Sequence, residues 1–143
     1  MPLASNQVQY SLLYRQPERN GLLAACQELG IALIAYSPLA KGLLTGKYAP
    51  GSRPAGLRGR RYNDEVLGKV APLSGLLRDI GQAHGKTPSQ VSLNWLICKG
   101  TLPIPGAKNA RQAAENAGAL GWRLGTDEVA ALEQAADATG VTA

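Results

Sequence analysis

The sequence predicts an α/β fold built on a short parallel sheet. Between residues 6 and 36 the pattern of apolar residues changes from strand to helix and back to strand, with short links. The second of these strands, in "GIALIAY", is continuously apolar, which is typical of a strand covered on both faces. Glycine-containing loops follow the second and third predicted strands, at the sheet edge where α/β folds bind ligands.

Each element of the first strand–helix–strand unit has its own signal. Alternating polarity around residues 6–10 predicts a strand that starts close to residue 1. Apolar residues at helical spacing predict a helix that begins near Pro17 and ends at Gly30. The apolar strand follows at residues 32–36. Because parallel strands need a crossover connection, this order predicts that the two strands run parallel.

The middle of the chain predicts a surface loop and two helices. Proline, glycine and arginine dominate residues 49–63, which we expect to loop over the surface. Apolar residues at helical spacing predict a helix over residues 64–83. The next helix has a predicted N-cap at Thr87, with Pro88 at its first position and Gln90 at capping-box spacing. A glycine marks its end.

A third strand and two helices complete the chain. "TLPIP" predicts a short strand in which two prolines limit the ladder hydrogen bonds. Asn109 and Gln112 again have capping-box spacing, and the final helix is predicted to start at Thr126. The loops after the second and third strands should therefore lie on the same edge of the sheet.

Composition is typical of one folded, soluble domain. The chain has 143 residues, of which 45% are hydrophobic, and the absence of phenylalanine predicts an aliphatic core. The formal net charge of +5 favours a solvated basic surface or, as the second interpretation, a small ligand that carries phosphate. No basic run is interleaved with aromatic residues, so nucleic acid is not an expected partner.

The sequence predicts no metal site and no membrane span. His84 is the single histidine, and Cys26 and Cys98 lack metal-ligand spacing. Both cysteines lie in apolar helical stretches, so we expect buried, reduced thiols and a reducing compartment, either the cytosol or the plastid stroma. No apolar run approaches the ~20 residues of a membrane span. The amino terminus has no basic segment followed by an apolar one, so no signal peptide is predicted.

Two loops have the composition of phosphate-binding loops. "YSPLAKGLLTGKY", residues 36–48, offers small residues, backbone amides and two lysines. "GAKNARQ" leads into a helix amino terminus, whose free N–H groups attract phosphate, and Lys108 lies beside it. Residue spacing alone also allows a structural interpretation of each loop. The first would be a buried tyrosine followed by a turn, and the second would be a capped surface helix.

Three stretches together resemble the carboxyl-terminal half of the aldo-keto reductases: "SNQVQYSLL", "IALIAYSPLAKGLLTGKY" and "PIPGAKNARQAAENAGALGWRL". The match covers nearly the whole chain in the right order. The chain resembles plant and algal plastid-type members, and its cofactor loops also resemble those of the potassium-channel beta subunits. Aldo-keto reductases are (β/α)8 TIM barrels that bind NADPH. The resemblance implies that residues 1–143 are the C-terminal portion of such an NADP-dependent oxidoreductase domain. This portion would be a partial barrel, with strands six to eight at residues 6–10, 32–36 and 102–105, their helices and the C-terminal helix.

The resemblance also implies which residues contact NADP(H). Gln7 would hydrogen-bond the nicotinamide carboxamide, and Tyr36 would stack on the nicotinamide ring. The residues that would line the pyrophosphate are Ser37, Pro38, Leu39, Ala40 and Gly42, with Lys47 reaching over it. The residues that would take the adenosine 2′-phosphate end are Gly106, Lys108, Gln112, Glu115 and Asn116. One arginine would close over the cofactor, and the four candidates are Arg53, Arg58, Arg60 and Arg61.

The same resemblance predicts no catalytic residue in this chain. The family uses a tyrosine acid assisted by a lysine, an aspartate and a histidine, all on earlier strands of the barrel. The residues that match none of these positions are His84, Tyr10, Tyr14, Tyr48 and Tyr62. We therefore expect a fragment of a longer reading frame that is inactive alone, with a small carbonyl compound as the substrate of the complete barrel.

Three parallel strands cannot close a barrel, so the sheet is expected to leave an open edge and an apolar inner face. The missing amino-terminal half-barrel would cover that face, or the chain would self-associate through the open edge. The alternative function is a non-catalytic half-barrel that works as a binding or assembly module.

Overall fold

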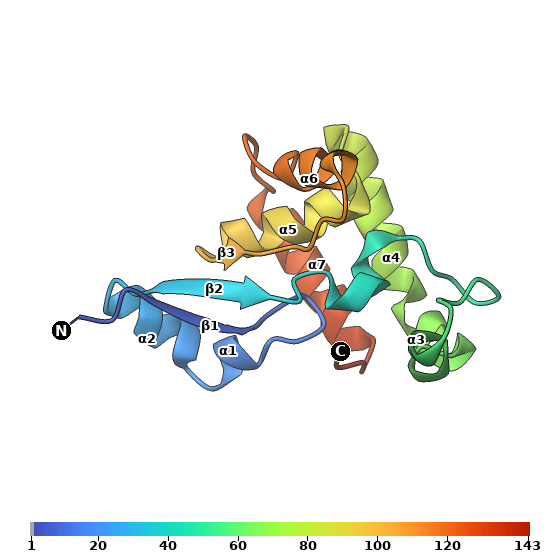
Figure 1. The fold of residues 1–143 in the computed structure, drawn as a ribbon, viewed down its shortest axis with the longest axis horizontal. Coiled ribbons are helices and arrows are strands. Elements are labelled where there is room, and N and C mark those ends of the chain that lie inside the picture. The colour runs from blue at the N-terminus through green and yellow to red at the C-terminus, as the bar shows by residue number, and fades with distance from the viewer. Residues whose placement is uncertain (1) are drawn as a thin grey trace.

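The computed structural model describes residues 2–143 and contains a three-stranded parallel sheet in the order β1-β2-β3. β1 (Ser5–Gln9) pairs with β2 (Ala32–Tyr36) along its length, and β2 pairs with the short β3 (Leu102–Pro103). Figure 1 shows β1 and β2 at one end of the molecule, with α2 along them, and the longer helices at the other end. The predicted α/β fold with parallel strands is confirmed.

The two faces of the sheet differ in burial. Leu33 and Ala35 of β2 are 2% and 0% exposed, because the helices cover this face. The register aligns Gln7 with Ile34, and Ile34 with Leu102, so these three side chains share the opposite face. On that open face, Leu102 is 57% exposed and Tyr36 is 42% exposed. Within residues 2–143, this face is therefore apolar and largely uncovered, as the sequence predicted.

The first predicted helix is in fact two helices. α1 (Gln16–Arg19) and α2 (Leu22–Glu28) are separated by Gly21, which has φ +80°. The Asn20 side chain accepts a hydrogen bond from the backbone N–H of Leu22 at 3.1 Å, which stabilises the turn between them. The apolar residues at helical spacing all follow this break, from Leu22 onward, and the pair Asn20-Gly21 is itself a turn signal in the sequence.

The remaining helices agree closely with the prediction. They are α4 (Asp64–His84), α5 (Pro88–Cys98), α6 (Ala110–Ala117) and α7 (Thr126–Ala138). The Thr87–Gln90 capping box is present with Pro88 at the start of α5, as predicted. The Asn109–Gln112 box is not: Asn109 caps α6, but the Gln112 side chain bonds the amide of Lys108 instead.

Two local predictions need correction. The surface loop at residues 49–63 contains a short helix, α3 (Leu57–Arg61), none of whose side chains is buried. The third strand is only two residues long, although Ile104 extends the ladder with one N–H···O bond to Ala35 at 3.0 Å. Pro103 and Pro105 lack the N–H groups that a longer ladder would need.

The core is aliphatic around one aromatic pair. Tyr10 and Trp95 are both fully buried and meet edge to face, with ring centroids 5.4 Å apart. Cys26 is buried as predicted, Cys98 is half-buried, and both are free thiols. No helix in residues 2–143 has the length and apolar character needed to cross a membrane.

Candidate functional site

The loop after β2, which we call the 37–48 loop (residues 37–48), has an unusual backbone. Ser37, Ala40 and Lys41 have φ values of +51°, +48° and +55°, which L-residues with a side chain rarely adopt. The loop includes the 3-10 segment η1 (Ala40–Thr45). Ala40 is fully buried, so core packing holds the strained conformation in place. Strain of this kind, about 1–3 kcal/mol per residue, is typical of functional loops.

The strained backbone leaves donors and cations at the surface. The N–H groups of Ser37, Leu39 and Lys41 have no hydrogen-bond partner within residues 2–143. Lys41 and Lys47 are exposed, and neither forms an ion pair with a carboxylate in the described part of the chain. A concentration of free amides and unpaired cations is a chemical match for phosphate oxygens.

Gly42 and Gly46 allow the loop to pack tightly. A Cβ on Gly42 would lie 3.1 Å from Cε2 of Tyr48, and a Cβ on Gly46 would lie 3.1 Å from Cγ of Pro88. Both glycines have positive φ, so each position needs glycine for conformation as well as for space. The 37–48 loop is therefore pressed against the start of α5.

The second loop leads from β3 into α6. Asn109 caps α6, since its side chain accepts from the N–H of Gln112 at 2.9 Å. Two side chains from α6 fold back on this loop: Gln112 Oε1 accepts from the Lys108 N–H at 2.7 Å, and Asn116 donates to the Gly106 carbonyl at 3.3 Å. The ammonium of Lys108 is exposed and unpaired in residues 2–143.

The side chain of Glu115 contacts α5, whereas those of Gln112 and Asn116 contact the loop before α6. Its carboxylate accepts from the Thr87 hydroxyl at 3.5 Å, at the start of α5. The sequence placed Gln112, Glu115 and Asn116 on one side of the helix. In the structure Gln112 and Asn116 order the Gly106–Lys108 backbone, whereas Glu115 joins α6 to α5.

The predicted nicotinamide contacts lie on the sheet. Gln7 is exposed on the open face of β1, and Tyr36 ends β2 with its side chain on the same face. Gln9 is in register with Tyr36, and its side chain donates to the carbonyl of Ala143 at 3.0 Å. The predicted contacts thus come from two neighbouring strands, β1 and β2, and from the segments that follow β2 and β3, at the strand ends where α/β folds bind ligands.

Comparison with known proteins identifies this arrangement. A model of the Aldo/keto reductase family matches residues 1–137. This chain belongs to the aldo/keto reductase family. It is 48% identical over 136 residues to the chloroplastic pyridoxal reductase of Arabidopsis thaliana, an alignment that covers 95% of this chain and 37% of that protein.

Two solved structures show the same fold. The glycerol dehydrogenase from Gluconobacter oxydans superposes with a TM-score of 0.85 at 22% identity, over 94% of this chain and 42% of that one. An aldo-keto reductase from Bombyx mori in complex with NADP gives a TM-score of 0.64 at 29% identity, over 92% of this chain and 36% of that one. The chain spans between 37% and 43% of the length of the first curated relatives.

Three tyrosines of this aldo-keto reductase chain, Tyr10, Tyr48 and Tyr62, are held in packing contacts. Tyr10 is fully buried and its hydroxyl donates to Glu18 at 2.5 Å. Burial, followed by the bond to Glu18, raises the pKa of Tyr10 far above its usual range, so it does not release a proton near neutral pH. Tyr62 is 2% exposed, and the ring of Tyr48 lies against Gly42.

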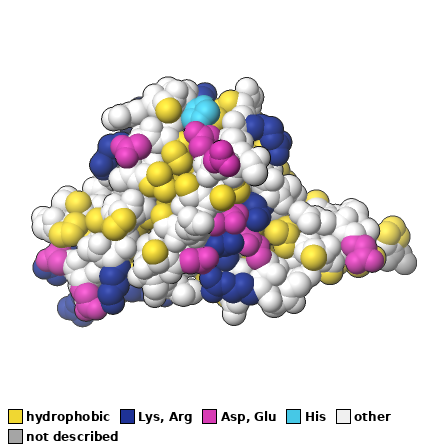
Figure 2. Space-filling view, turned by 180° about the vertical axis from the view of Figure 1, so that it is seen from behind, with side chains coloured by type: hydrophobic (Ala, Val, Ile, Leu, Met, Phe, Trp, Pro, Cys, Tyr) yellow, Lys and Arg dark blue, Asp and Glu magenta, His cyan; other side chains and the backbone are white. Residues whose placement is uncertain are grey.

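His84 has a structural partner at the surface. Its Nε2 lies 2.8 Å from Oε1 of Glu128, and its ring lies 5.0 Å from that of Trp122. Figure 2 shows the single histidine, in cyan, beside acidic side chains. This contact joins the end of α4 to the start of α7, as expected for a residue that decorates a helix end. No three His, Cys, Asp or Glu side chains in residues 2–143 form a metal-binding group.

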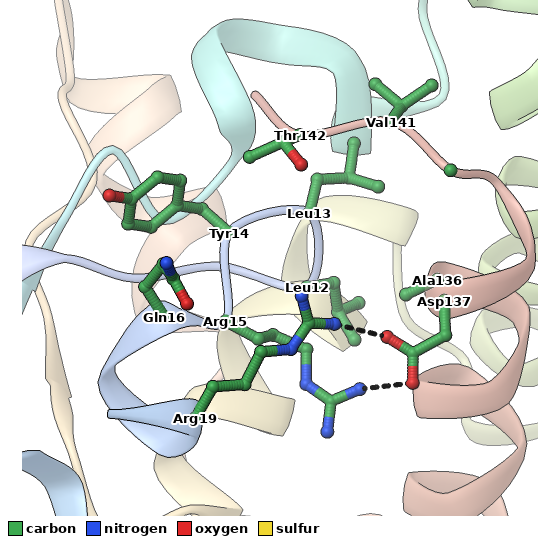
Figure 3. Close-up of a pocket in the computed structure, with 11 residues that line it drawn as sticks. Leu12, Leu13, Tyr14, Arg15, Gln16, Arg19, Ala136, Asp137, Val141 and Thr142 are labelled. Atoms are coloured by element: carbon green, nitrogen blue, oxygen red, sulfur yellow. Dashed lines mark hydrogen bonds and ion pairs between the residues drawn. The ribbon is translucent and has the colours of Figure 1, made fainter. Parts of the chain in front are cut away.

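Two cavities within residues 2–143 have no predicted cofactor residue in their lining. One, of about 410 Å³, lies between the segment after β1 and the segment after α7; its polar lining includes Arg15 and Arg19, which both bond Asp137 (Figure 3). The other, of about 490 Å³, is lined by parts of α2, α5 and α7. The predicted cofactor residues therefore lie outside these two cavities.

Proposed function

We propose that this chain is the NADPH-binding part of an aldo-keto reductase that reduces an aldehyde or a ketone to an alcohol. In this proposal β1, β2 and β3 are the sixth, seventh and eighth strands of the barrel. The observation that carries it is the pair of loops at the carboxyl ends of β2 and β3, with free amides in one and a capped helix amino terminus in the other. Three lysines, Lys41, Lys47 and Lys108, lie on these two loops, and none of them forms an ion pair within residues 2–143.

The residues present fit a dinucleotide that carries a 2′-phosphate. The amides of Ser37, Leu39 and Lys41 would bind pyrophosphate oxygens, and Lys47 would neutralise their charge. Lys108 would pair with the 2′-phosphate, because a dianionic group favours a nearby cation. Tyr36, at the end of β2, would give the nicotinamide ring a flat surface, and Gln7 would bond its carboxamide. When bound, NADPH supplies the hydride.

The proton donor is outside this chain in the proposed mechanism. Tyr10, Tyr48 and Tyr62 are fixed in packing contacts, and Tyr14 lines the cavity that also contains Arg15. A general acid must lie within hydrogen-bond reach of the carbonyl oxygen. We propose that the catalytic tyrosine, lysine, aspartate and histidine belong to the other part of the barrel. The 48% identical pyridoxal reductase supports an aldehyde substrate, and pyridoxal is the first compound to test on the assembled barrel.

The open face of the sheet exposes apolar side chains, which favours a partner that covers it. Leu102, Ile104 and Tyr36 are 57%, 42% and 42% exposed there. A contiguous exposed apolar patch is typical of a surface that another polypeptide or a ligand covers. We propose that the remaining strands of the barrel cover it, and self-association through the open sheet edge is the alternative. The same observation favours the second candidate function, a non-catalytic binding or assembly module.

Titration of the purified chain with NADPH, followed by nicotinamide fluorescence, tests the proposed cofactor site. We expect saturable binding that Lys108→Ala weakens about tenfold, or about 1.4 kcal/mol, for NADPH but not for NADH. Lys69→Ala is the matched control, because Lys69 is an exposed lysine on α4 that pairs with Glu65. Equal affinities of the Lys108→Ala variant and the unmodified chain for NADPH would refute the assignment of Lys108. Absence of binding by a folded, monodisperse chain would refute an independent cofactor site.

A further inference from the structure

We propose that Gln90 is a positioning residue for the cofactor, because its hydrogen bond to α6 sets the distance between the two cofactor loops. This inference rests on the proposed function. Gln90 lies in the first turn of α5 and is not among the predicted cofactor contacts. Its side chain joins two backbone groups that are distant in the sequence: Oε1 accepts from the Thr87 N–H at 3.0 Å, and Nε2 donates to the Glu115 carbonyl at 2.8 Å.

The start of α5 contacts the 37–48 loop on one side and α6, the helix that follows the second loop, on the other. On one side, Pro88 packs against Gly46, and the Ser92 hydroxyl donates to the Leu44 carbonyl at 3.4 Å. On the other side, Gln90 bonds the Glu115 carbonyl of α6. Residues 91–96 of α5 are all buried, so this helix is anchored in the core. α5 is thus the rigid element that lies between the 37–48 loop and α6.

The contact between Gln90 and α6 is closely fitted. A Cβ on Gly118 would lie 2.2 Å from Nε2 of Gln90, so glycine is the residue that leaves room for the amide. One turn further along α5, the buried amide of Asn94 donates to the Ala119 and Trp122 carbonyls at 2.9 and 2.8 Å. Gln90 therefore holds α6 itself, whereas Asn94 holds the segment that follows it. The two side chains thus attach two successive parts of the chain, α6 and the segment after it, to α5.

The distance between the loops matters because a dinucleotide is one molecule with two ends. Once its 2′-phosphate end is bound at α6, the pyrophosphate and nicotinamide are held at a high effective concentration near the 37–48 loop. This advantage is lost if the second subsite shifts away from the span of the ligand. Loss of the Gln90 bond should therefore weaken the whole dinucleotide more than either half of it.

Gln90→Glu separates this role from the local one. A glutamate keeps the acceptor for the Thr87 N–H, since Glu is as suitable as Gln at this capping-box position, but it loses the donor to the Glu115 carbonyl. Gln134→Glu on α7 is the matched control, because Gln134 is an exposed helical glutamine. The two probes are NADPH and adenosine 2′,5′-bisphosphate, which keeps the adenosine, the 2′-phosphate and one 5′-phosphate but lacks the nicotinamide half. Both are titrated against the 143-residue chain, whose fold is checked by circular dichroism.

We expect Gln90→Glu to weaken NADPH at least tenfold and to change the affinity for adenosine 2′,5′-bisphosphate less than twofold. An equal loss for both probes would mean that Gln90 only maintains α6, and an unchanged NADPH affinity would mean that the bond is dispensable; either result overturns the inference. If the unmodified chain binds neither probe, the proposed function fails, and the inference fails with it.

Hydrogen exchange gives a readout that needs no ligand. In Gln90→Glu, the amides of α6 should exchange faster, while those of α7 keep the rate of the unmodified chain. Unchanged exchange across residues 110–117 would show that the Glu115 bond does not hold α6, and would overturn the inference independently of any cofactor result.

Discussion

Replacement of Asn94 by alanine tests whether side-chain amides on α5 hold the segment that follows α6. Asn94 is fully buried. Its Nδ2 donates to the carbonyls of Ala119 and Trp122 at 2.9 and 2.8 Å, and its Oδ1 accepts from the Leu124 N–H at 2.9 Å. These bonds connect α5 with residues that are 25 to 30 positions further along the chain. Alanine provides none of them.

The expected loss of stability follows from the groups that are left without partners. Each buried backbone group that loses its hydrogen bond costs about 1–3 kcal/mol. Ala119 and Leu124 are 3% and 7% exposed, whereas Trp122 is half-buried, so water can rescue its carbonyl in part. We therefore expect Asn94→Ala to lower the free energy of unfolding by about 3–5 kcal/mol. That is a large fraction of the 5–15 kcal/mol that is typical of a whole domain.

Urea unfolding followed by tryptophan fluorescence measures this loss, because Trp95 and Trp122 lie on either side of the connection. Asn20→Ala is the control: Asn20 is exposed and accepts one bond, from Leu22, so its loss should cost about 0.5–1 kcal/mol. If Asn94→Ala lowers the free energy of unfolding by no more than the control does, water or a shifted backbone replaces all three bonds. The account of α5 as a rigid support would then be wrong.

Two further substitutions test the 37–48 loop and the contact between α4 and α7. Gly46→Ala should lower the free energy of unfolding by about 1 kcal/mol more than Gly30→Ala. Both positions have positive φ, but only a Cβ at Gly46 would press on Pro88. Thermal unfolding compares the two variants, and equal losses of stability would contradict the contact between Gly46 and Pro88. Glu128→Gln should destabilise the chain at neutral pH, with a difference that shrinks in acid. Partial burial works to raise the pKa of Glu128, but hydrogen bonds from Gly125 and His84 lower it overall. The ionised Glu128 carboxylate therefore stabilises the fold fully above the ordinary carboxyl pKa, and this stabilisation is lost as the pH falls through the lowered pKa. A difference in unfolding free energy that stays constant at every pH would argue against the ionised contact.

The regular elements could be predicted from sequence because their signals are local. β2 lies within the apolar run that begins at Ile31, and α5 begins where Thr87 and Gln90 form a capping box with Pro88 at the first position. A side chain that bonds a backbone group three residues away acts through a contact that the sequence itself contains. The family could be predicted for a similar reason, since the loops and strands that carry the resemblance are continuous stretches of sequence.

The features that sequence did not reveal depend on distant contacts. Ala40 adopts a positive φ because the core encloses it, and no residue near it in the sequence indicates that. Gln90 was predicted correctly as a capping residue, but its second bond, to Glu115, exists only when α6 packs on α5. Glu115 itself was expected beside the cofactor with Gln112, and its contact with Thr87 likewise follows from this packing.

The same packing would favour the proposed binding of a dinucleotide at these two loops. Each strained residue of the 37–48 loop costs about 1–3 kcal/mol, which folding of the core must supply before any ligand arrives. A loop that is already fixed loses little further freedom on binding, so more of its interaction energy remains as affinity. That advantage extends to both ends of the ligand only if α6 is fixed relative to the loop. The contact of Pro88 with Gly46 and the bond of Gln90 to Glu115 are the two attachments through which α5 does this. Variants at Gly46 and at Gln90 should therefore share one signature, a loss of NADPH affinity that exceeds the loss for adenosine 2′,5′-bisphosphate.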